Sequence, residues 1–119
     1  MLNELRDIVM SNQRALIVMI VFIALDVVTG VLKAIVEGKL NSTKLKEGIF
    51  HKILEVIVII VGVFLDFLLE VNYIANSVTI ALVGMEGISI LENIGNYIPL
   101  PDVLRKVIEQ LSQNDHTEI

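Results

Sequence analysis

Residues 15–35 read ALIVMIVFIALDVVTGVLKAI, an apolar segment with only two charged side chains, Asp26 and Lys33. As an α-helix rising about 1.5 Å per residue it would be about 31 Å long, close to the hydrocarbon thickness of a bilayer, about 30 Å. A helix also satisfies its own backbone hydrogen bonds, as lipid requires. The segment therefore predicts a transmembrane helix.

Two further apolar segments follow this one. Residues 53–69, ILEVIVIIVGVFLDFLL, would form a helix of about 26 Å, and residues 73–91 one of about 28 Å, so both can span if the bilayer thins slightly. Only residues 70–72 lie between them. The β-branched run at 56–60 would also suit a buried strand, but an isolated strand in lipid leaves its backbone unpaired. We therefore predict an all-α membrane protein with three transmembrane helices, at about 15–35, 53–69 and 73–91.

The segments outside the predicted spans are amphipathic. Residues 1–14 contain a short N-terminal helix of this kind, and apolar residues recur at helical spacing after Asp102, which is placed as an N-cap. Such helices lie on the membrane surface or pack on a neighbour. No segment has the composition of a linker, so we expect one domain over 1–119, with a transmembrane region at 15–99 and a cytoplasmic tail at 100–119.

The composition supports membrane residence and excludes several chemistries. The chain of 119 residues is 55% hydrophobic, with a mean hydropathy of +0.76, which is too apolar for an ordinary soluble domain of this length. It has no cysteine, which excludes disulfides, thiolate metal sites and cysteine nucleophiles. It has no P-loop, G-x-S-x-G or H-E-x-x-H motif, and His51 and His116 lack metal-ligand spacing. We expect no enzyme activity, cofactor, metal or nucleic-acid partner.

Basic residues are unequally divided between the two sides that three spans define. The N-terminal segment and the 70–72 turn share one side, which carries two basic residues, Arg6 and Arg14. The other side, formed by residues 36–52 and the tail, carries six, namely Lys39, Lys44, Lys46, Lys52, Arg105 and Lys106. By the positive-inside rule the N-terminus faces outward and the C-terminus faces the cytoplasm.

The first predicted span carries a polar stripe along one helical face. Its members are Asp26, Thr29, Gly30, Lys33 and Ala34. An acidic side chain at mid-membrane costs about 2.5–3.5 kcal/mol, so Asp26 should face protein or water, or be neutral. Gly30 and Ala34 form a small-xxx-small pair, which lets another helix approach closely.

The other two spans repeat this pattern. The stripe of the second span consists of Glu55, Gly62 and Asp66. The stripe of the third consists of Thr79, Glu86, Ser89 and Asn93. Because residues seven apart return to nearly the same helical face, each set lies close to one line. The members of all three stripes are candidates for pore lining or helix packing.

Each stripe also has a purely structural interpretation. Lys33 and Glu55 lie about two residues inside the cytoplasmic border, so snorkelling explains them equally well. Asp26, Asp66 and Glu86 are deeper, and they either hydrogen-bond between helices or line water. Three stripes are difficult to bury in one three-helix monomer without leaving a carboxylate unpaired, which favours self-association into a homo-oligomer.

The connection between the first two spans is rich in lysine. Lys39, Lys44, Lys46 and Lys52 would hold anionic lipid headgroups, although a topology signal explains them equally well.

Four motifs follow one another along the chain: DVVTGVLKA at 26–34, GKLNSTKLKEGIFHK at 38–52, the acidic Asp66, and EGISILENIGNYIPLP at 86–101. In this order they resemble the phage holin family, which also includes clostridial toxin-secretion holins. The resemblance implies a protein that oligomerises in the cytoplasmic membrane of a bacterial host and opens holes for an endolysin or toxin, without necessarily touching either. It maps onto Asp26, Thr29, Gly30, Gly38, Ser42, Gly48, Lys52, Asp66, Glu86, Ser89, Glu92, Asn93 and Pro101.

One departure from the family and two other functions remain open at this point. Holins often end in a strongly basic segment, whereas residues 102–119 contain two basic and four acidic residues. The same stripes would also serve a small scaffold or accessory subunit of another membrane complex. A small ion or proton carrier would use Asp26 and Glu86 as relay sites.

Overall fold

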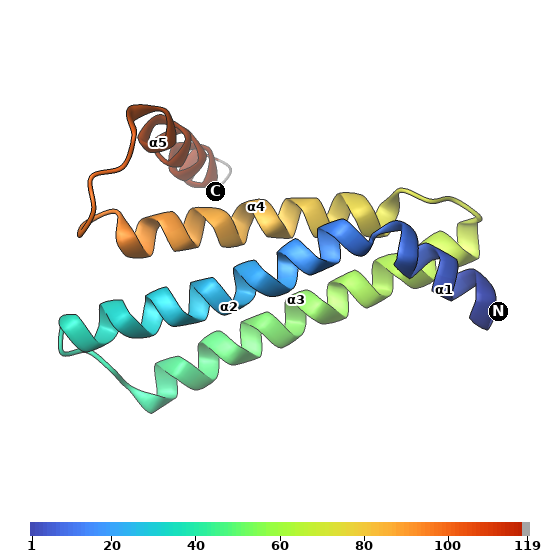
Figure 1. The fold of residues 1–119 in the computed structure, drawn as a ribbon, viewed down its shortest axis with the longest axis horizontal. Coiled ribbons are helices and arrows are strands. Elements are labelled where there is room, and N and C mark those ends of the chain that lie inside the picture. Colours follow the sequence, from blue (N-terminus) through green and yellow to red (C-terminus); the bar gives the residue numbers. More distant parts are fainter. Residues whose placement is uncertain (118–119) are drawn as a thin grey trace.

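The structure, a computed structural model, describes residues 1–117, with the side chains described for residues 1–110. Every regular element in that part of the chain is an α-helix, which confirms the predicted all-α class. In chain order the elements are α1 (Leu2–Ser11), α2 (Gln13–Val36), α3 (Ser42–Leu69), α4 (Ile74–Ile94) and α5 (Asp102–Thr117) (Figure 1).

The three long helices form a bundle in which α4 is the shared neighbour. α4 packs along both α2 and α3, whereas α2 and α3 touch each other far less. Figure 1 shows α2 and α3 diverging toward the connection at 37–41. α1 packs on α3 at the opposite end, near the 70–73 turn, and α5 packs on α4. The N-terminus and the 70–73 turn therefore lie at the same end of the bundle.

Two of the three predicted spans are confirmed as candidate membrane helices. α2 and α4 are long and apolar enough to cross a membrane. α3 is not such a candidate, so the prediction of a span at 53–69 is not confirmed. The physical reason is charge, because Lys52, Glu55 and Asp66 lie within or beside the apolar part of α3.

α3 also begins earlier than the sequence indicated. Residues 42–52 were expected to belong to the connection between spans, but they form the first turns of α3. Asn41 has extended backbone angles, and its side-chain oxygen accepts a hydrogen bond from the Thr43 N–H at 2.8 Å. This is the geometry of an N-cap, which satisfies a backbone donor that a helix start leaves unpaired.

The connection before α3 is short because a glycine, Gly38, reverses the chain two residues after the end of α2. Gly38 adopts a φ of 67°, a left-handed conformation that glycine reaches without steric cost. The Lys39 N–H then donates back to the Ala34 carbonyl at 2.8 Å, as in a Schellman motif. The chain therefore reverses direction within residues 37–41.

Asp66 organises the tight turn between α3 and α4. Its backbone carbonyl accepts from the Val71 N–H at 3.1 Å, just after Glu70, which is left-handed at φ 54°. Its carboxylate accepts from the N–H groups of Ile74 and Ala75, at 2.8 and 3.0 Å. Asp66 therefore caps the first turn of α4 from the last turn of α3, and its side chain is buried.

α3 and α4 approach each other most closely at Gly62. A Cβ atom at Gly62 would lie 3.2 Å from the Cα of Ala75, so a larger side chain would meet backbone. Thr79, one turn further along α4, is fully buried and donates to the Ala75 carbonyl at 2.7 Å. The close helix contact at Gly62 therefore forms within one chain.

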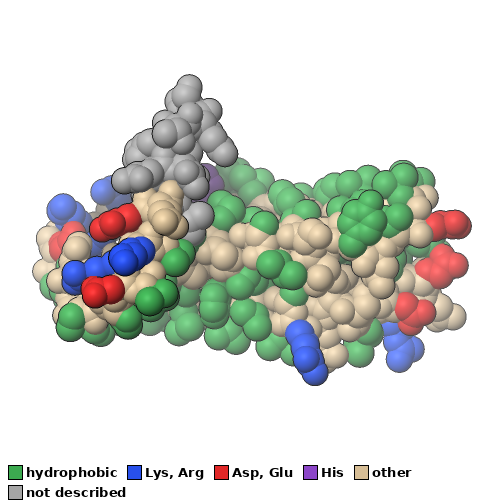
Figure 2. Space-filling model, turned by 90° about the horizontal axis from the view of Figure 1, so that it is seen from above, with side chains coloured by type: hydrophobic (Ala, Val, Ile, Leu, Met, Phe, Trp, Pro, Cys, Tyr) green, Lys and Arg blue, Asp and Glu red, His purple; other side chains and the backbone are tan. Residues whose placement is uncertain are grey.

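The distribution of polarity is the reverse of that in a soluble protein. The largest fully buried side chains in the described part of the chain are Glu86, Thr79 and Asp66. Large hydrophobic side chains cover the outside of α2, α3 and α4. Figure 2 shows these hydrophobic side chains along the length of the molecule, with most charged side chains near its two ends. An apolar exterior around a polar interior suits lipid as the surrounding medium.

Candidate functional site

The centre of the bundle holds an ion-pair network that joins all three long helices. Lys52, from α3, places its Nζ 2.6 Å from Oδ2 of Asp26 on α2. The same Nζ lies 2.7 and 2.6 Å from Oε1 and Oε2 of Glu86 on α4. The side chains of Lys52, Asp26 and Glu86 are 17%, 13% and 2% exposed. Charged hydrogen bonds this short, in partly or fully buried positions, are strong ones.

Asn93 extends the network along the α2–α4 contact. Its Nδ2 donates to Oδ1 of Asp26 at 3.1 Å and to Oγ1 of Thr29 at 2.9 Å. The Thr29 hydroxyl donates in turn to the Leu25 carbonyl of its own helix at 2.8 Å. Both carboxylate oxygens of Asp26 therefore have partners, one an ammonium and the other an amide.

The charges of this network do not balance. One ammonium faces the two carboxyl groups of Asp26 and Glu86, so the set is neutral only when one of them carries a proton. Glu55 lies one turn beyond Lys52 on α3, and its Oε2 is buried without a hydrogen-bond partner. A buried polar atom without a partner costs about 1–3 kcal/mol. The network therefore holds more acidic than basic groups.

The remaining stripe residues lie at the edge of this network or away from it. Gly30 has room, since a Cβ there would meet only Nδ2 of Asn93, at 3.6 Å. Gly30, Ala34 and Ser89 instead line a cavity. Lys33 is half-buried on α2 and takes no part in the network. Within the chain, Gly30 and Ala34 therefore line this cavity and form no close helix contact, and their role between chains stays a prediction.

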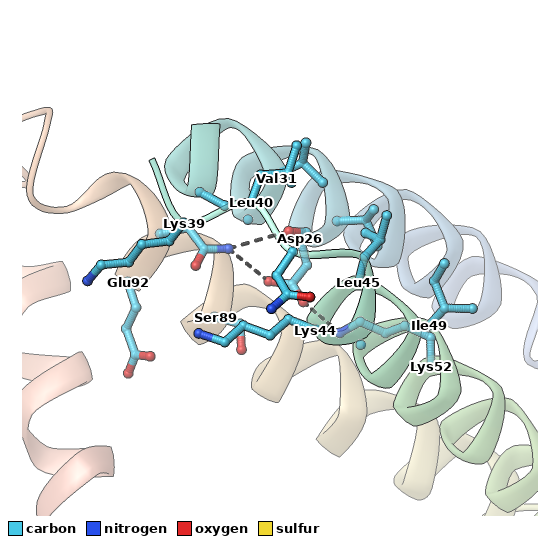
Figure 3. Close-up of a pocket in the computed structure, with 16 residues that line it drawn as sticks. Asp26, Val31, Lys39, Leu40, Lys44, Leu45, Ile49, Lys52, Ser89 and Glu92 are labelled. Atoms are coloured by element: carbon cyan, nitrogen blue, oxygen red, sulfur yellow. Dashed lines mark hydrogen bonds and ion pairs between the residues drawn. The ribbon is translucent and has the colours of Figure 1, made fainter. Parts of the chain in front are cut away.

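The cavity lies between α2 and α3, where these helices diverge, and has a volume of about 410 Å³. Its polar floor includes Asp26, Lys52 and Asn93. Lys39 and Lys44 lie at its outer end, as Figure 3 shows for both side chains together with Glu92. The four lysines that were predicted to hold headgroups therefore do not act alike. Lys52 is bound by two carboxylates inside the bundle, whereas Lys39 and Lys44 lie at the mouth of the cavity.

The structure also shows contacts that the sequence analysis did not identify. Gly87 of α4 accommodates the ring of Phe22, whose nearest carbon would lie 3.3 Å from a Cβ at that position. At the end of the bundle near the 37–41 connection, the Tyr97 hydroxyl donates to Oε2 of Glu37 at 2.8 Å. That hydrogen bond to a carboxylate raises the pKa of Tyr97 above its ordinary value. The sequence pattern did not predict these two contacts, because each joins residues that are far apart in the chain.

The argument that one monomer would leave a carboxylate of the three stripes unpaired is wrong for the deep acids. Asp26 and Glu86 share Lys52, and Asp66 accepts two backbone N–H groups. The stripes face one another inside a single chain. Burial of these acids therefore gives no reason for self-association.

Comparison with known proteins finds one matching family and three bacterial relatives. The bacteriophage holin family matches this chain over residues 6–113. An uncharacterised protein of Clostridium perfringens (strain 13 / Type A) is 36% identical over 104 residues, covering 85% of this chain and 77% of the relative. The "uncharacterized 14.9 kDa protein in nagH 3′ region" of Clostridium perfringens is 39% identical over 100 residues, covering 82% and 76%. An uncharacterised protein of Clostridium acetobutylicum is 33% identical over 99 residues, covering 81% and 79%. No solved structure matches the chain.

Proposed function

Because this chain belongs to the bacteriophage holin family, we propose that it is a non-enzymatic pore former of the cytoplasmic membrane. In this role copies of the chain oligomerise and open holes through which an endolysin or toxin leaves the cell. The family match over residues 6–113 carries the proposal. The apolar exterior and the polar interior of the bundle support it, because a pore former needs both a surface for lipid and a surface for water.

The proposal includes α3 as a third membrane-spanning helix beside α2 and α4. The charged groups that set α3 apart are turned inward, with Lys52 paired and Asp66 capping α4. The exposed hydrophobic side chains of its apolar part are Ile53, Leu54, Val56, Ile57, Val58, Ile60, Val61, Phe64, Leu65, Leu68 and Leu69. A lipid environment therefore meets an aliphatic surface on α3, as it does on α2 and α4.

In the proposed mechanism, the network of Lys52, Asp26 and Glu86 is buried in the packed bundle and faces water once the pore opens. In the packed bundle Lys52 pairs with both acids, and the surface of the long helices is largely apolar. Moving α3 away from α2 and α4 would leave three charged groups without partners, which only water or other subunits can stabilise. Assembly of several opened chains around a common lumen provides both.

The proposed topology has three spans, with the N-terminus outside and the C-terminus in the cytoplasm. The chain has no cysteine of its own, so Ser11→Cys and Ser42→Cys each introduce a unique thiol. In spheroplasts, a membrane-impermeant maleimide is expected to label the first variant directly and the second only after permeabilisation. Labelling of both variants from the same side would show that α2 does not cross the membrane between residues 11 and 42.

The function is tested by expression in a bacterium with and without a cytoplasmic muralytic enzyme. We expect culture turbidity to fall abruptly only when both proteins are present, and a folded cytoplasmic reporter protein to appear in the medium. The control is the enzyme-bearing strain without this chain, which should remain turbid.

The same experiment separates the two other functions. A scaffold subunit would leave the reporter inside and the culture turbid. An ion carrier would collapse ion gradients while still retaining the reporter. Either result, with the chain present in the membrane at the level of a lytic control, would overturn the proposal.

A further inference from the structure

The cavity between α2 and α3 combines a cationic mouth with apolar walls. We propose that it binds an anionic phospholipid, with the phosphate held by Lys39 and Lys44 and the start of an acyl chain lying between the two helices. This inference depends on the membrane location of the chain but not on pore formation, so each can fail without the other.

The charge at the mouth favours an anion. Lys44 takes part in none of the ion pairs among the described residues, and Lys39 is 70% exposed and 3.9 Å from a carboxylate oxygen of Glu37. Two acids lie beside these lysines: Glu92 lines the mouth with them (Figure 3), and Glu37 pairs with Lys39 from outside the cavity. Among the residues that line the cavity, Lys39, Lys44 and Lys52 outnumber Asp26 and Glu92. The positive end of the α3 helix dipole, at Asn41, also borders the cavity.

The walls fit a hydrocarbon chain. They are formed by Val27 and Val31 of α2, by Leu45 and Ile49 of α3, and by Leu40 of the connection. Gly48 adds open space, since a Cβ there would meet nothing within 4 Å. A volume of about 410 Å³ lies within the range of about 300–1,000 Å³ for small-molecule sites. It suits a headgroup and the start of one chain, with the rest of the lipid in the bilayer.

The position of the cavity matches that of phosphates in a membrane. Lys39 and Lys44 lie just beyond the end of α2, at the level where a spanning helix meets the headgroups. Because Leu40, Leu45 and Ile49 both line the cavity and are exposed on the surface, a chain can enter from the side of the bundle. The floor of the cavity is already occupied by the ion pair of Asp26 and Lys52, so the ligand phosphate belongs at the mouth.

The test measures lipid binding to the purified full-length chain in neutral detergent by native mass spectrometry. Phosphatidylglycerol is expected to bind at least tenfold more tightly than phosphatidylcholine, which has the phosphate but no net charge. Lys44→Gln should weaken phosphatidylglycerol binding about fivefold, in line with one lost cationic contact. Lys46→Gln removes the same charge from the same cluster outside the cavity, and it should change binding less than twofold.

A third variant tests the apolar walls separately from the charge. Gly48→Leu fills the open space and should weaken phosphatidylglycerol binding about fivefold or more while leaving the helical circular dichroism signal unchanged. Free glycerol 3-phosphate should compete only at concentrations far above those of the lipid. Equal losses for Lys44→Gln and Lys46→Gln would show diffuse surface attraction and would overturn the proposal. Equal affinities for glycerol 3-phosphate and for phosphatidylglycerol, with no effect of Gly48→Leu, would show that the cavity binds a soluble phosphate. That result would also overturn the proposal.

Discussion

Replacement of Lys52 by methionine is expected to destabilise the helical bundle by about 3–5 kcal/mol, the usual cost of removing one partner from a buried ion pair. Methionine keeps most of the volume of the lysine stem, so the loss arises from charge rather than from a cavity. Without the ammonium, the carboxylates of Asp26 and Glu86 would face each other inside the bundle with no cation between them. Thermal unfolding in detergent, followed by circular dichroism, measures the change.

Two further variants assign that loss to the ion pair. Combining Lys52→Met with Asp26→Asn and Glu86→Gln removes every charge of the network together, and it should recover most of the stability. Lys46→Met removes an exposed lysine from the same helix and should leave the unfolding temperature nearly unchanged. A Lys52→Met protein that melts like the wild type would show that the three helices do not depend on this network.

Replacement of Asp66 by alanine is expected to lower the free energy of unfolding by about 2–6 kcal/mol. The change leaves the N–H groups of Ile74 and Ala75 without their acceptors, and each unsatisfied buried donor costs about 1–3 kcal/mol. Asp66→Asn keeps one side-chain oxygen as an acceptor, so its cost should be clearly smaller. The measurement is thermal unfolding in detergent, together with the rate of proteolysis within residues 70–73.

Glu70 provides the matched control for that experiment. It is an exposed acid at the same turn, four residues after Asp66, and its side chain makes no hydrogen bond or ion pair in the described structure. Glu70→Gln should therefore unfold and resist protease like the wild type. If Asp66→Ala proves no less stable than Glu70→Gln, then the start of α4 does not need its cap.

The sequence predicted the faces of the helices better than their partners. Periodicity placed Asp26, Asp66 and Glu86 on polar stripes, and the structure turns these stripes toward the interior of the bundle. Periodicity describes rotation about one helix axis, however, and says nothing about which helix lies opposite. The contact of Asp26 with Asn93 and the shared role of α4 between α2 and α3 therefore required the structure.

Lys52 shows most clearly why the site itself was not predicted. It lies one residue before the apolar segment 53–69, so it was interpreted with the other basic residues of the connection. Because α3 is a continuous helix through that border, the long side chain of Lys52 can reach back to the acids of α2 and α4. Because Asp26 and Glu86 share this one cation, both acids have a partner within one chain. Glu55 of the second stripe keeps a buried oxygen without a partner among the described residues, and self-association stays a prediction.

The ion-pair network also bears on the order in which the chain is synthesised. Asp26 leaves the ribosome 26 residues before Lys52 and 67 residues before Asn93. α2 therefore meets the bilayer while its carboxyl group has no partner, and it is the more apolar of the two candidate spans, which offsets a penalty of about 2.5–3.5 kcal/mol. α4 is less apolar, but Glu86 emerges when Lys52 has already been made. The helix whose acid is synthesised before its cation is thus the more apolar of the two candidate spans.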